Sequence, residues 1–485
     1  MAKITTIIDI GSNSMRMVVF KKTSRFAFHL INESKSKVKI SEGCYQNNGN
    51  LQELPMQRGF DALQSFLQIA KNLKSRKILC VATSALRDAP NKQVFISKVS
   101  KELKLNIKII DGAKEAYYGG VSALNLIACD NFTTLDIGGG STEFSFIKDK
   151  NITDNISLKI GTVRIKELFF DKDDLVGAKK YIYDELSKID KDIDTVVGLG
   201  GSARALSRII LERDNYPIDS LHGFKYKVSK NIELFKSIVD AKTSQELKEL
   251  GVEKDRFDTI KTGTFIFKTI LEYFEVRKVI TSSAGVREGV YLADILRTSN
   301  CKFPANFNVS VRSLLDRFVD DVSQSAYLGN NSKKIFDVLQ PLHKLGDKYK
   351  SILVIASKLQ QVGLSLNFDH NQDHAFWYIL NGISYDFTHE DKVLIAIVSK
   401  FTKKSLPTKK DIKEYKKLLP NLEIIRWLNF MMTLNISLNS EYSKILYSYS
   451  LEKDILEISS ENKQYLVQRA LEKIEMPVEL ELVLK

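Results

Sequence analysis

Residues 133–144 read TTLDIGGGSTEF, which is an apolar strand ending in an aspartate, a turn of three glycines and the start of a second strand. Glycine is costly to order and brings no side chain to pack, so three in a row predict a close approach to the backbone. Carboxylates stand on both sides of the turn, at Asp136 and at Glu143. The stretch therefore predicts a site where bare backbone and two acidic side chains face one ligand.

The same pattern occurs at the start of the chain. Residues 5–20, TTIIDIGSNSMRMVVF, repeat the apolar strand, the Asp-Ile-Gly core, the polar turn and the return strand of residues 133–147. Asp-Ile-Gly alone could recur by chance, but the strands before and after it also agree, which favours an internal duplication. Further strands are expected at 77–84 and 106–111, with a helix at 115–128. Strands that alternate with helices are typical of an α/β layer architecture.

Length and composition set the outer limits. A chain of 485 residues can form two or three domains with full cores. Its 72 Lys and Arg against 59 Asp and Glu give a net charge of +13, which favours an anionic partner without choosing among nucleic acid, nucleotide, polyphosphate and membrane surface. No signal peptide pattern and no apolar run of transmembrane length occur, so we expect a soluble, cytoplasmic protein. Four scattered cysteines are predicted to be free thiols in a reducing compartment: Cys44, Cys80, Cys129 and Cys301.

The chain changes character from about residue 300. Glycines become rare, and helical patterns at 351–363, 374–383 and 392–401 predict a separate all-helical domain. Within it, residues 400–417 carry eight lysines against one Asp and one Glu. This segment is either the solvated face of a helix or a patch that binds a polyanion.

Two hairpin turns, Gly11–Ser14 and Gly138–Thr142, can each point several backbone N–H groups at one spot, and such nests bind phosphate oxygens. The chain has neither the P-loop nor the dinucleotide-binding fingerprint. We therefore predict phosphate loops of a hairpin type. A third glycine turn precedes a helix pattern, where the helix N-terminus could hold an anion or a ribose. Its residues are Gly200, Gly201 and Ser202.

The acidic residues beside these turns predict a metal. Carboxylates at Asp136 and Glu143 would repel a bound phosphate unless a divalent cation stood between them, and Mg²⁺ commonly bridges carboxylates and phosphate oxygens. The alternative is that Asp136 only caps the turn while Glu143 faces solvent. Because the Asp9 loop repeats the arrangement, we favour a Mg²⁺ site at Asp136 and Glu143.

Hydrolysis of a phosphoanhydride also needs a base for water and positive charge for the phosphoryl group. Glu115 stands at a strand-to-helix transition, where side chains emerge toward a cleft, although a first-turn Glu can simply complement the helix dipole. Asp111 and Glu143 are competing candidates. Arg16 and Arg87 follow the predicted loops and strands and are the candidate cations.

Eight segments now form an ordered set: IDIGSNSMRMVVF, ATSALRDAPN, IDGAKEAYYGGV, TLDIGGGSTEF, IGTVRIKELFF, VGLGGSARAL, LHGF and SSAGVREGVYL. Together they closely resemble the Ppx/GppA family of exopolyphosphatases and guanosine pentaphosphate phosphohydrolases, over about residues 4–295. The family belongs to the superfamily of actin, sugar kinases and Hsp70. The resemblance implies two duplicated actin-like (ribonuclease H-like) α/β domains, residues 1–124 and 125–300, that flank a cleft. It implies a C-terminal HD-like helical domain at residues 301–485.

The resemblance also implies residue roles. Glu115 becomes the catalytic base, Arg87 the active-site arginine, and Asp136 with Glu143 the carboxylates of a Mg²⁺ site. The implied reaction is in-line attack of water, activated by Glu115, on a terminal phosphoryl group. The implied phosphate loops consist of Asp9, Gly11, Ser12, Asn13, Ser14 and Arg16, and of Asp136, Gly138, Gly139, Gly140, Ser141 and Thr142.

This sequence departs from the family pattern in two places. Lys114 stands where the family often has a first glutamate, which could alter the pKa of the base or the substrate preference. In the C-terminal part, Gln360 and Gln361 replace the His-Asp pair of HD-type domains, so no second metal site is expected although His370 and His374 follow.

Three functions remain open at this point. The favoured one is hydrolysis of polyphosphate, of guanosine pentaphosphate (pppGpp) to ppGpp, or of both. The alternatives are transfer of phosphate from ATP to an acceptor, and a sensor that binds nucleotide or polyphosphate without turnover. We expect no specific nucleic-acid or membrane partner, and a homodimer is plausible from the resemblance.

Overall fold

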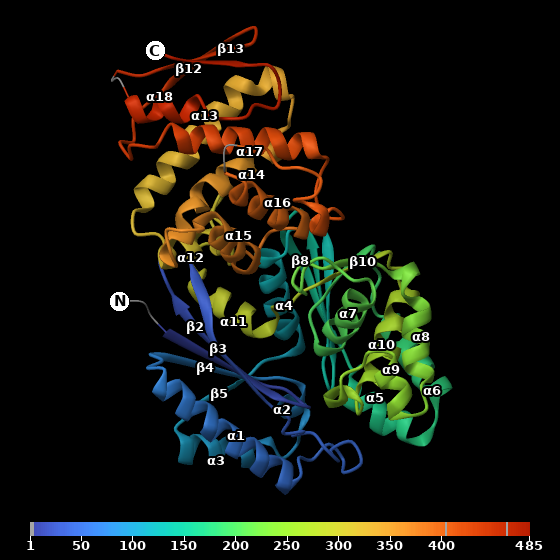
Figure 1. The fold of residues 1–485 in the computed structure, drawn as a ribbon. Coiled ribbons are helices and arrows are strands. Elements are labelled where there is room, and N and C mark those ends of the chain that lie inside the picture. The colour runs from blue at the N-terminus through green and yellow to red at the C-terminus, as the bar shows by residue number, and fades with distance from the viewer. Residues whose placement is uncertain (1–3, 403–404, 462–463) are drawn as a thin grey trace. The chain divides into compact units, whose positions relative to one another are not determined.

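The computed structural model describes residues 4–402, 405–461 and 464–485. The chain divides into two compact units, Met1–Phe307 and Asn308–Lys485 (Figure 1). The first unit contains two β-sheets with their covering helices. The second unit is mainly helical.

The first sheet has five strands in the order β3-β2-β1-β4-β5. β1, β2 and β3 form an antiparallel meander, and β4 and β5 continue the sheet parallel to β1. The strands expected in residues 5–20, at 77–84 and at 106–111 are present, and the helix expected at 115–128 is present but begins three residues earlier, at Gly112. The bounds are β1 (Ile4–Ile10), β2 (Met15–Lys22), β3 (Phe28–Ser36), β4 (Lys77–Ala82), β5 (Ile107–Ile109), α1 (Glu53–Asn72), α2 (Ser84–Asp88) and α3 (Lys92–Leu103).

The second sheet repeats this topology. Its strand order, read from one edge, is β8-β7-β6-β9-β11, with an extra edge strand β10. Again three strands form an antiparallel meander and the next two run parallel to its first strand. The strand bounds are β6 (Phe132–Ile137), β7 (Thr142–Lys148), β8 (Asn151–Leu158), β9 (Thr195–Gly198), β10 (Lys225–Lys227) and β11 (Lys278–Thr281). The matching topology supports the predicted duplication.

Helices α5 to α10 cover one face of this second sheet and share an apolar core with it (Figure 1). The core is built from the inward side chains of β6, β7 and β9 and the apolar stripes of α6, α7 and α10. The helix bounds are α5 (Thr162–Leu168), α6 (Leu175–Leu186), α7 (Gly201–Arg213), α8 (Ile232–Asp240), α9 (Ser244–Glu249) and α10 (Ile260–Tyr273).

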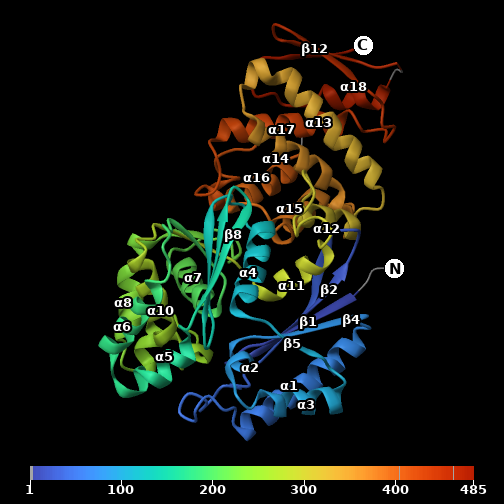
Figure 2. The same cartoon turned by 180° about the vertical axis from the view of Figure 1, so that it is seen from behind.

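Two helices, α4 (Gly112–Leu126) and α11 (Val286–Ile295), lie between the two sheets and cross each other (Figure 2). α4 packs on β7 and β8, while α11 packs on β1. Glycines allow this close packing, because a Cβ at Gly289 would overlap the Tyr118 carbonyl and one at Gly120 would overlap Ser145. The boundary predicted at residue 124 falls inside α4.

The second unit contains seven helices in its described residues, and three of them start at an Asn or Asp cap, namely Asn308, Asp321 and Asn421. It also contains a three-stranded sheet that the sequence analysis did not predict. β12 and β13 form a hairpin whose turn includes Lys453, and β14 pairs in parallel with β13. The bounds are α12 (Val309–Phe318), α13 (Val322–His343), α14 (Asp347–Leu359), α15 (Asn371–Gly382), α16 (His389–Lys400), α17 (Leu422–Ser437), α18 (Tyr465–Leu471), β12 (Ser448–Glu452), β13 (Ile455–Ser459) and β14 (Glu481–Leu484).

Beyond Lys400, the described residues of the lysine-rich segment 400–417 do not form a helix face. α16 ends at Lys400, and the described residues beyond it form turns and a short 3-10 helix, η5 (Lys413–Tyr415). Pro407 disfavours helix at this point, and Asp411 accepts hydrogen bonds from Thr408 instead. The helix-face interpretation is therefore wrong, and the polyanion patch stays a prediction. Its lysines 403 and 404 lie outside the described residues.

Across the described parts of both units, the helices are all too short or too polar to cross a bilayer.

Candidate active site

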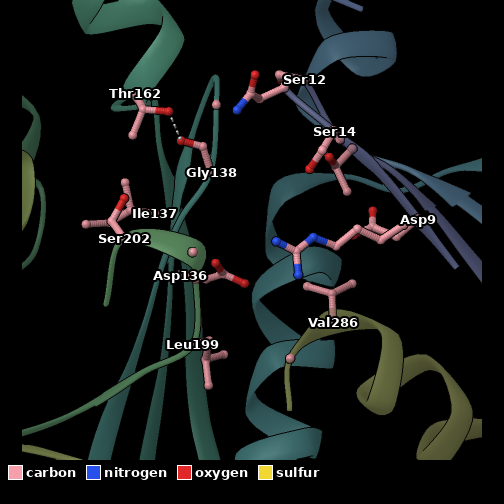
Figure 3. A pocket seen from close by; sticks show the side chains of 18 of the residues that line it. Asp9, Ser12, Ser14, Asp136, Ile137, Gly138, Thr162, Leu199, Ser202 and Val286 are labelled. Carbon is pink, nitrogen blue, oxygen red and sulfur yellow. Dashed lines mark hydrogen bonds between the residues drawn. The ribbon is translucent and has the colours of Figure 1, made fainter. Parts of the chain in front are cut away.

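The two predicted loops occupy equivalent places in the two sheets and face each other across a cleft (Figure 3). In the first hairpin Asp9 pairs with Arg16 across the strands, and in the second Asp136 pairs with Glu143. Residues directly opposite each other in an antiparallel pair project from the same face of a sheet. Each hairpin thus presents two charged side chains on one face, and Asp9 and Asp136 lie on opposite sides of the cleft.

The cleft has a volume of about 160 Å³ and is lined mainly by polar residues and glycines. It contains most of the predicted site, and the lining residues drawn from the prediction are Asp9, Gly11, Ser12, Asn13, Ser14, Arg16, Glu115, Asp136, Gly138, Gly139, Glu143, Gly200, Gly201 and Ser202. Four predicted residues are not part of this lining: Arg87, Gly140, Ser141 and Thr142. Asp111, the competing base, is exposed and caps α4 by accepting a hydrogen bond from the Lys114 backbone N–H.

Two of the three glycines of the second loop, Gly139 and Gly140, are required by packing. A Cβ on Gly139 would come within 2.6 Å of the Ser12 Cβ, so the two loops touch here. A Cβ on Gly140 would lie 2.7 Å from the Tyr45 hydroxyl and 2.9 Å from the Ser84 hydroxyl. Such distances leave no room for a side chain. The glycines therefore permit contact between the two halves of the unit, in addition to any approach by phosphate.

Glu115 lies in the first turn of α4, is buried, and forms an ion pair of 2.9 Å with Arg87. The start of this helix is packed tightly, since a Cβ on Gly112 would overlap the side chain of Ser157. The Ser157 hydroxyl in turn donates a hydrogen bond of 2.8 Å to Glu143. Burial, together with the nearby Glu143 carboxylate, raises the pKa of Glu115 well above its ordinary value.

The Lys114 side chain does not join this site. Its Nζ lies 4.1 Å from the ring centroid of Tyr117, a cation–π contact on the flank of α4. Arg87, by contrast, reaches both halves of the unit, because it donates to Glu115 and also to the Ser141 hydroxyl at 3.3 Å. The position of Arg87 is therefore tied to both the base candidate and the second loop.

The other carboxylates also have raised pKa values. Burial, with Asp136 nearby, raises the pKa of Glu143 to about 7, and burial raises the pKa of Asp9 to about 6. Burial raises the pKa of Asp136 as well. The Asp9 Oδ1 atom is buried and has no hydrogen-bond partner in the described part of the chain. Crowded, desolvated carboxylates with an unsatisfied oxygen fit a divalent cation, whose charge removes their repulsion.

No cluster of three or more His, Cys, Asp or Glu among the described residues is arranged as a complete metal site. A cation held by Asp136 and Glu143 would thus complete its coordination with water and substrate oxygens. Mg²⁺ commonly binds in this way, with one or two carboxylates and several waters.

Three further arginines line the cleft and were not singled out in the sequence: Arg204, Arg256 and Arg287. Arg287 forms an ion pair of 2.8 Å with Glu33, which also lies 4.0 Å from Arg16. Burial lowers the pKa of Arg204 to about 10, with the charges of Arg16 and Arg287 adding to the effect. One part of the cleft is therefore cationic, which suits a multiply charged anion. Arg204 lies in the GGSAR segment and Arg287 in the AGVREG segment, but the spacing of the residues in these segments did not predict a role for either arginine.

This architecture and this cleft define the class of the protein: an actin-like fold with two facing phosphate-type hairpins. The model of the Ppx/GppA phosphatase family matches residues 18–298, and the model of its domain III matches residues 308–480. The chain belongs to the Ppx/GppA phosphatase family. The predicted family and fold class are thereby confirmed, as is the general activity, hydrolysis of phosphate groups.

Individual relatives agree with this assignment. A bifunctional 3-dehydroquinate synthase/phosphatase of Fusobacterium nucleatum is 32% identical over 311 residues, which cover 59% of this chain and 46% of that protein. The chain thus spans about half the length of that relative. A guanosine-5'-triphosphate,3'-diphosphate pyrophosphatase of Aeromonas hydrophila is 25% identical over 402 residues, 80% of this chain and 78% of the relative.

Solved structures support the fold. The crystal structure of the Aquifex aeolicus family member is 28% identical, with a TM-score of 0.52 over 62% of this chain and 99% of that chain. An exopolyphosphatase structure from Cytophaga hutchinsonii shares the fold at 23% identity, with a TM-score of 0.56 over 60% of this chain and 98% of the other.

Proposed function

We propose that the protein hydrolyses the terminal phosphoanhydride of inorganic polyphosphate, of pppGpp, or of both. The observation that carries this proposal is the position of Glu115, buried in the wall of a cleft that two phosphate-type loops close from either side. The names of two similar proteins, a pppGpp pyrophosphatase and an exopolyphosphatase, indicate the substrate classes. Both substrates are polyanions that end in a chain of phosphates, which suits the cationic wall of the cleft.

In the proposed reaction Glu115 accepts a proton from a water molecule as that water attacks the terminal phosphorus in line. The bond to the leaving phosphate oxygen breaks, and that oxygen keeps the electron pair. Glu115 must be ionised to act as base. Its ion pair with Arg87 favours the ionised form against the opposing effects of burial and Glu143.

Arg87 and the loops position the reacting groups. Arg87 fixes one Glu115 oxygen and contacts Ser141, so it couples the base to the second phosphate loop. The loop segments and Arg16 bind the terminal phosphates by hydrogen bonds and charge. Asp136 and Glu143 hold Mg²⁺, which supplies positive charge beside the phosphate oxygens when bound.

The test is phosphate release in the presence of Mg²⁺ from long-chain polyphosphate and from pppGpp. Glu115→Gln keeps the shape of the side chain and removes the base, so we expect a loss of two orders of magnitude or more, on the scale of about 10²–10⁴ for general base catalysis. Asp111→Asn is the matched control on the same helix, with an expected change of less than about threefold, because an Asn can also cap a helix.

Each outcome separates the three functions. Glu115-dependent release establishes the hydrolase, and the ratio of the two rates identifies the preferred substrate. A wild-type protein that binds both substrates and releases nothing is a sensor. Transfer of phosphate from ATP to an acceptor, rather than to water, indicates the phosphotransferase. The predicted homodimer can be checked on the same preparation by its mass in solution.

A further inference from the structure

The start of α5 supplies an arginine that the proposed reaction does not use. Arg164 belongs to the half of the first unit that carries the second sheet, and its side chain is mostly buried. Its Nε donates a hydrogen bond of 2.9 Å to the carbonyl of Gly140, the last glycine of the second loop. Its backbone N–H donates to the carbonyl of Gly139 at 3.1 Å. Arg164 is therefore attached to the second loop through both its backbone and its side chain.

The same guanidinium also reaches the half that carries the first sheet. Its Nη2 donates to the Asp88 carboxylate at 3.2 Å, and its Cζ lies 4.6 Å from the ring centroid of Tyr45. A second side chain of α5, Glu167, accepts a hydrogen bond from the Gly43 N–H at 3.3 Å. Helix α5 thus holds the first half at two places, the end of α2 and the segment around Tyr45.

Asp88 links Arg164 to the arginine that contacts the candidate base. One of its carboxylate oxygens, Oδ2, accepts from Arg164, and the other, Oδ1, lies 3.6 Å from the Nε of Arg87. Arg87 in turn donates to Glu115 at 2.9 Å and to the Ser141 hydroxyl of the second loop at 3.3 Å. These contacts form a closed ring, which leaves the second loop through Arg164, passes through Asp88 and Arg87, and returns to the loop.

From this geometry we propose that Arg164 and Asp88, which we call the latch, hold the two halves together beside the cleft and thereby position Arg87 and Glu115 for the attack of water. The proposal rests on the proposed function, since it assumes that Glu115 is the base. Two neighbouring arginines repel each other, and the carboxylate between them offsets that repulsion.

The latch acts through Arg87 and not on the substrate. Neither Arg164 nor Asp88 lines the cleft. The Arg87 guanidinium has a partner at each of its three nitrogens, which are Glu115 at Nη1, Ser141 at Nη2 and Asp88 at Nε. Without the latch the Nε side loses its partner, and the guanidinium can turn away from Glu115. Arg164 and Asp88 are therefore positioning residues.

The test is steady-state kinetics of the full chain with Mg²⁺ and whichever of polyphosphate and pppGpp the wild type hydrolyses. A misplacement of about 1 Å can cost about 10²-fold in rate, so Arg164→Ala and Asp88→Asn are each expected to lower kcat about tenfold or more. KM should change by less than about threefold, because the phosphate loops and the arginines of the cleft remain. The double variant should have the kcat of the slower single variant, because both changes break the same link.

Two further variants separate positioning from a general loss of structure. Arg164→Lys keeps the charge but lacks the rigid fork that serves Gly140 and Asp88 together, so its kcat should lie between those of the wild type and Arg164→Ala. The control is Arg277→Ala, which removes an ion pair with Asp194 in the same half and lies outside the cleft lining. The control is expected to leave both kcat and KM unchanged.

A second readout does not depend on turnover. Cys44 is buried and lies in the sequence between Gly43 and Tyr45, the two residues of this segment that α5 contacts. Loss of the latch should raise the rate at which a thiol reagent labels Cys44 in the native protein by about tenfold or more, on the scale of a hydrogen bond to a charged group. The buried Cys80 in β4 should keep its rate. Mass spectrometry of the labelled peptides distinguishes the two cysteines.

The proposal is overturned by effects that multiply in the double variant, by a normal kcat in Arg164→Ala, by a raised KM with kcat intact, or by unchanged labelling of Cys44. If hydrolysis depends on Glu115 but not on the latch, only this inference fails and the proposed function stands. If the wild type hydrolyses neither substrate, the proposed function fails and the catalytic role of the latch fails with it. Faster labelling of Cys44 would then support only the contact between the two halves.

Discussion

Replacing Glu143 by Gln is expected to stabilise the metal-free protein at pH 8, although it removes a proposed Mg²⁺ ligand. The carboxyl is 3% exposed, and burial raises its pKa from the ordinary 4.5 to about 7. A folded-state pKa above the unfolded value means that ionisation opposes folding. The penalty is absent below pH 4.5, grows as pH rises and is complete above pH 7. Gln cannot ionise and so avoids it.

The size of the effect follows from the two pKa values. One whole pKa step corresponds to about 1.4 kcal/mol, so the rise from 4.5 to about 7 corresponds to about 3 kcal/mol at pH 8. At pH 4.5 and below the substitution gains nothing by this route. It loses part of the hydrogen bond from Ser157, whose net value is about 1 kcal/mol. The sign of the substitution's effect is therefore expected to change between pH 4.5 and 8.

The assay is denaturant-induced unfolding in EDTA at pH 4.5, 6 and 8, for the wild type, Glu143→Gln and the surface control Glu212→Gln. The transition that belongs to the first unit can be followed by the two buried cysteines, Cys44 and Cys80, which react with a thiol reagent once exposed. We expect the difference in unfolding free energy between Glu143→Gln and wild type to rise with pH. The control is exposed and should show no such trend.

A Glu143→Gln protein that is destabilised equally at all three pH values would refute the reasoning. That result would mean that the pKa of Glu143 in the folded metal-free protein equals its unfolded value, and that the hydrogen bond from Ser157 offsets its desolvation. The closely spaced, buried carboxylates of the cleft would then not support a divalent cation site.

Two further predictions follow from the same packing and charges. Added Mg²⁺ should stabilise the wild type more at pH 8 than at pH 5, because a metal binds ionised carboxylates. At one hundred times its Kd, the gain in unfolding free energy is about 2.7 kcal/mol. Asp136→Asn should lose most of this gain, and an equal gain at both pH values would contradict the proposed Mg²⁺ site. Gly289→Ala should cost about 1–3 kcal/mol in unfolding free energy, because its Cβ overlaps the Tyr118 carbonyl. Gly285→Ala, whose Cβ meets open space, is the control, and equal losses in both variants would show that packing between α4 and α11 is not the cause.

Much of the first unit could be predicted from the sequence because its signals are local. Each loop lies within about ten residues of its two strands, and the Asp-Ile-Gly core marks both copies. The small sheet of the second unit shows the limit of this approach. β13 alternates buried and exposed residues as a strand should, but its partner β14 comes from the end of the chain and carries only four residues. A pairing across that distance leaves no local signal.

The candidate site divides in the same way. Glu115, Asp136 and Glu143 stood out because each follows a recognisable strand or turn. Arg256 did not, because no local motif marks it, and its neighbour Asp255 contacts Lys35, which lies 220 residues away in the sequence. The glycines at 139 and 140 were predicted from the approach of a ligand, yet the structure adds contacts to Ser12, Tyr45 and Ser84. Such contacts exist only after the two halves have folded together.

The duplicated fold builds an asymmetric site by using the same motif in two ways. The segment after β5 reads Gly-Ala-Lys-Glu, and the segment after β11 reads Gly-Val-Arg-Glu. In the first copy the lysine stacks on Tyr117 and Glu115 faces the cleft. In the second copy the glutamate, Glu288, turns back to accept from the Gly285 N–H at 2.7 Å, and Arg287 lines the cleft.

The hairpins differ in the same sense. The position opposite the aspartate that the two hairpins share is Arg16 in the first copy and Glu143 in the second. Two identical halves would place the same charges on both walls of the cleft, and such a cleft could not offer both a catalytic base and a cationic surface for a polyanion. Because the first copy has an arginine where the second has a glutamate, the carboxylates lie together around Glu143 and the arginines lie together around Arg287. Hydrolysis of a phosphate chain needs both, because the attacking water requires a base while the chain itself requires positive charge.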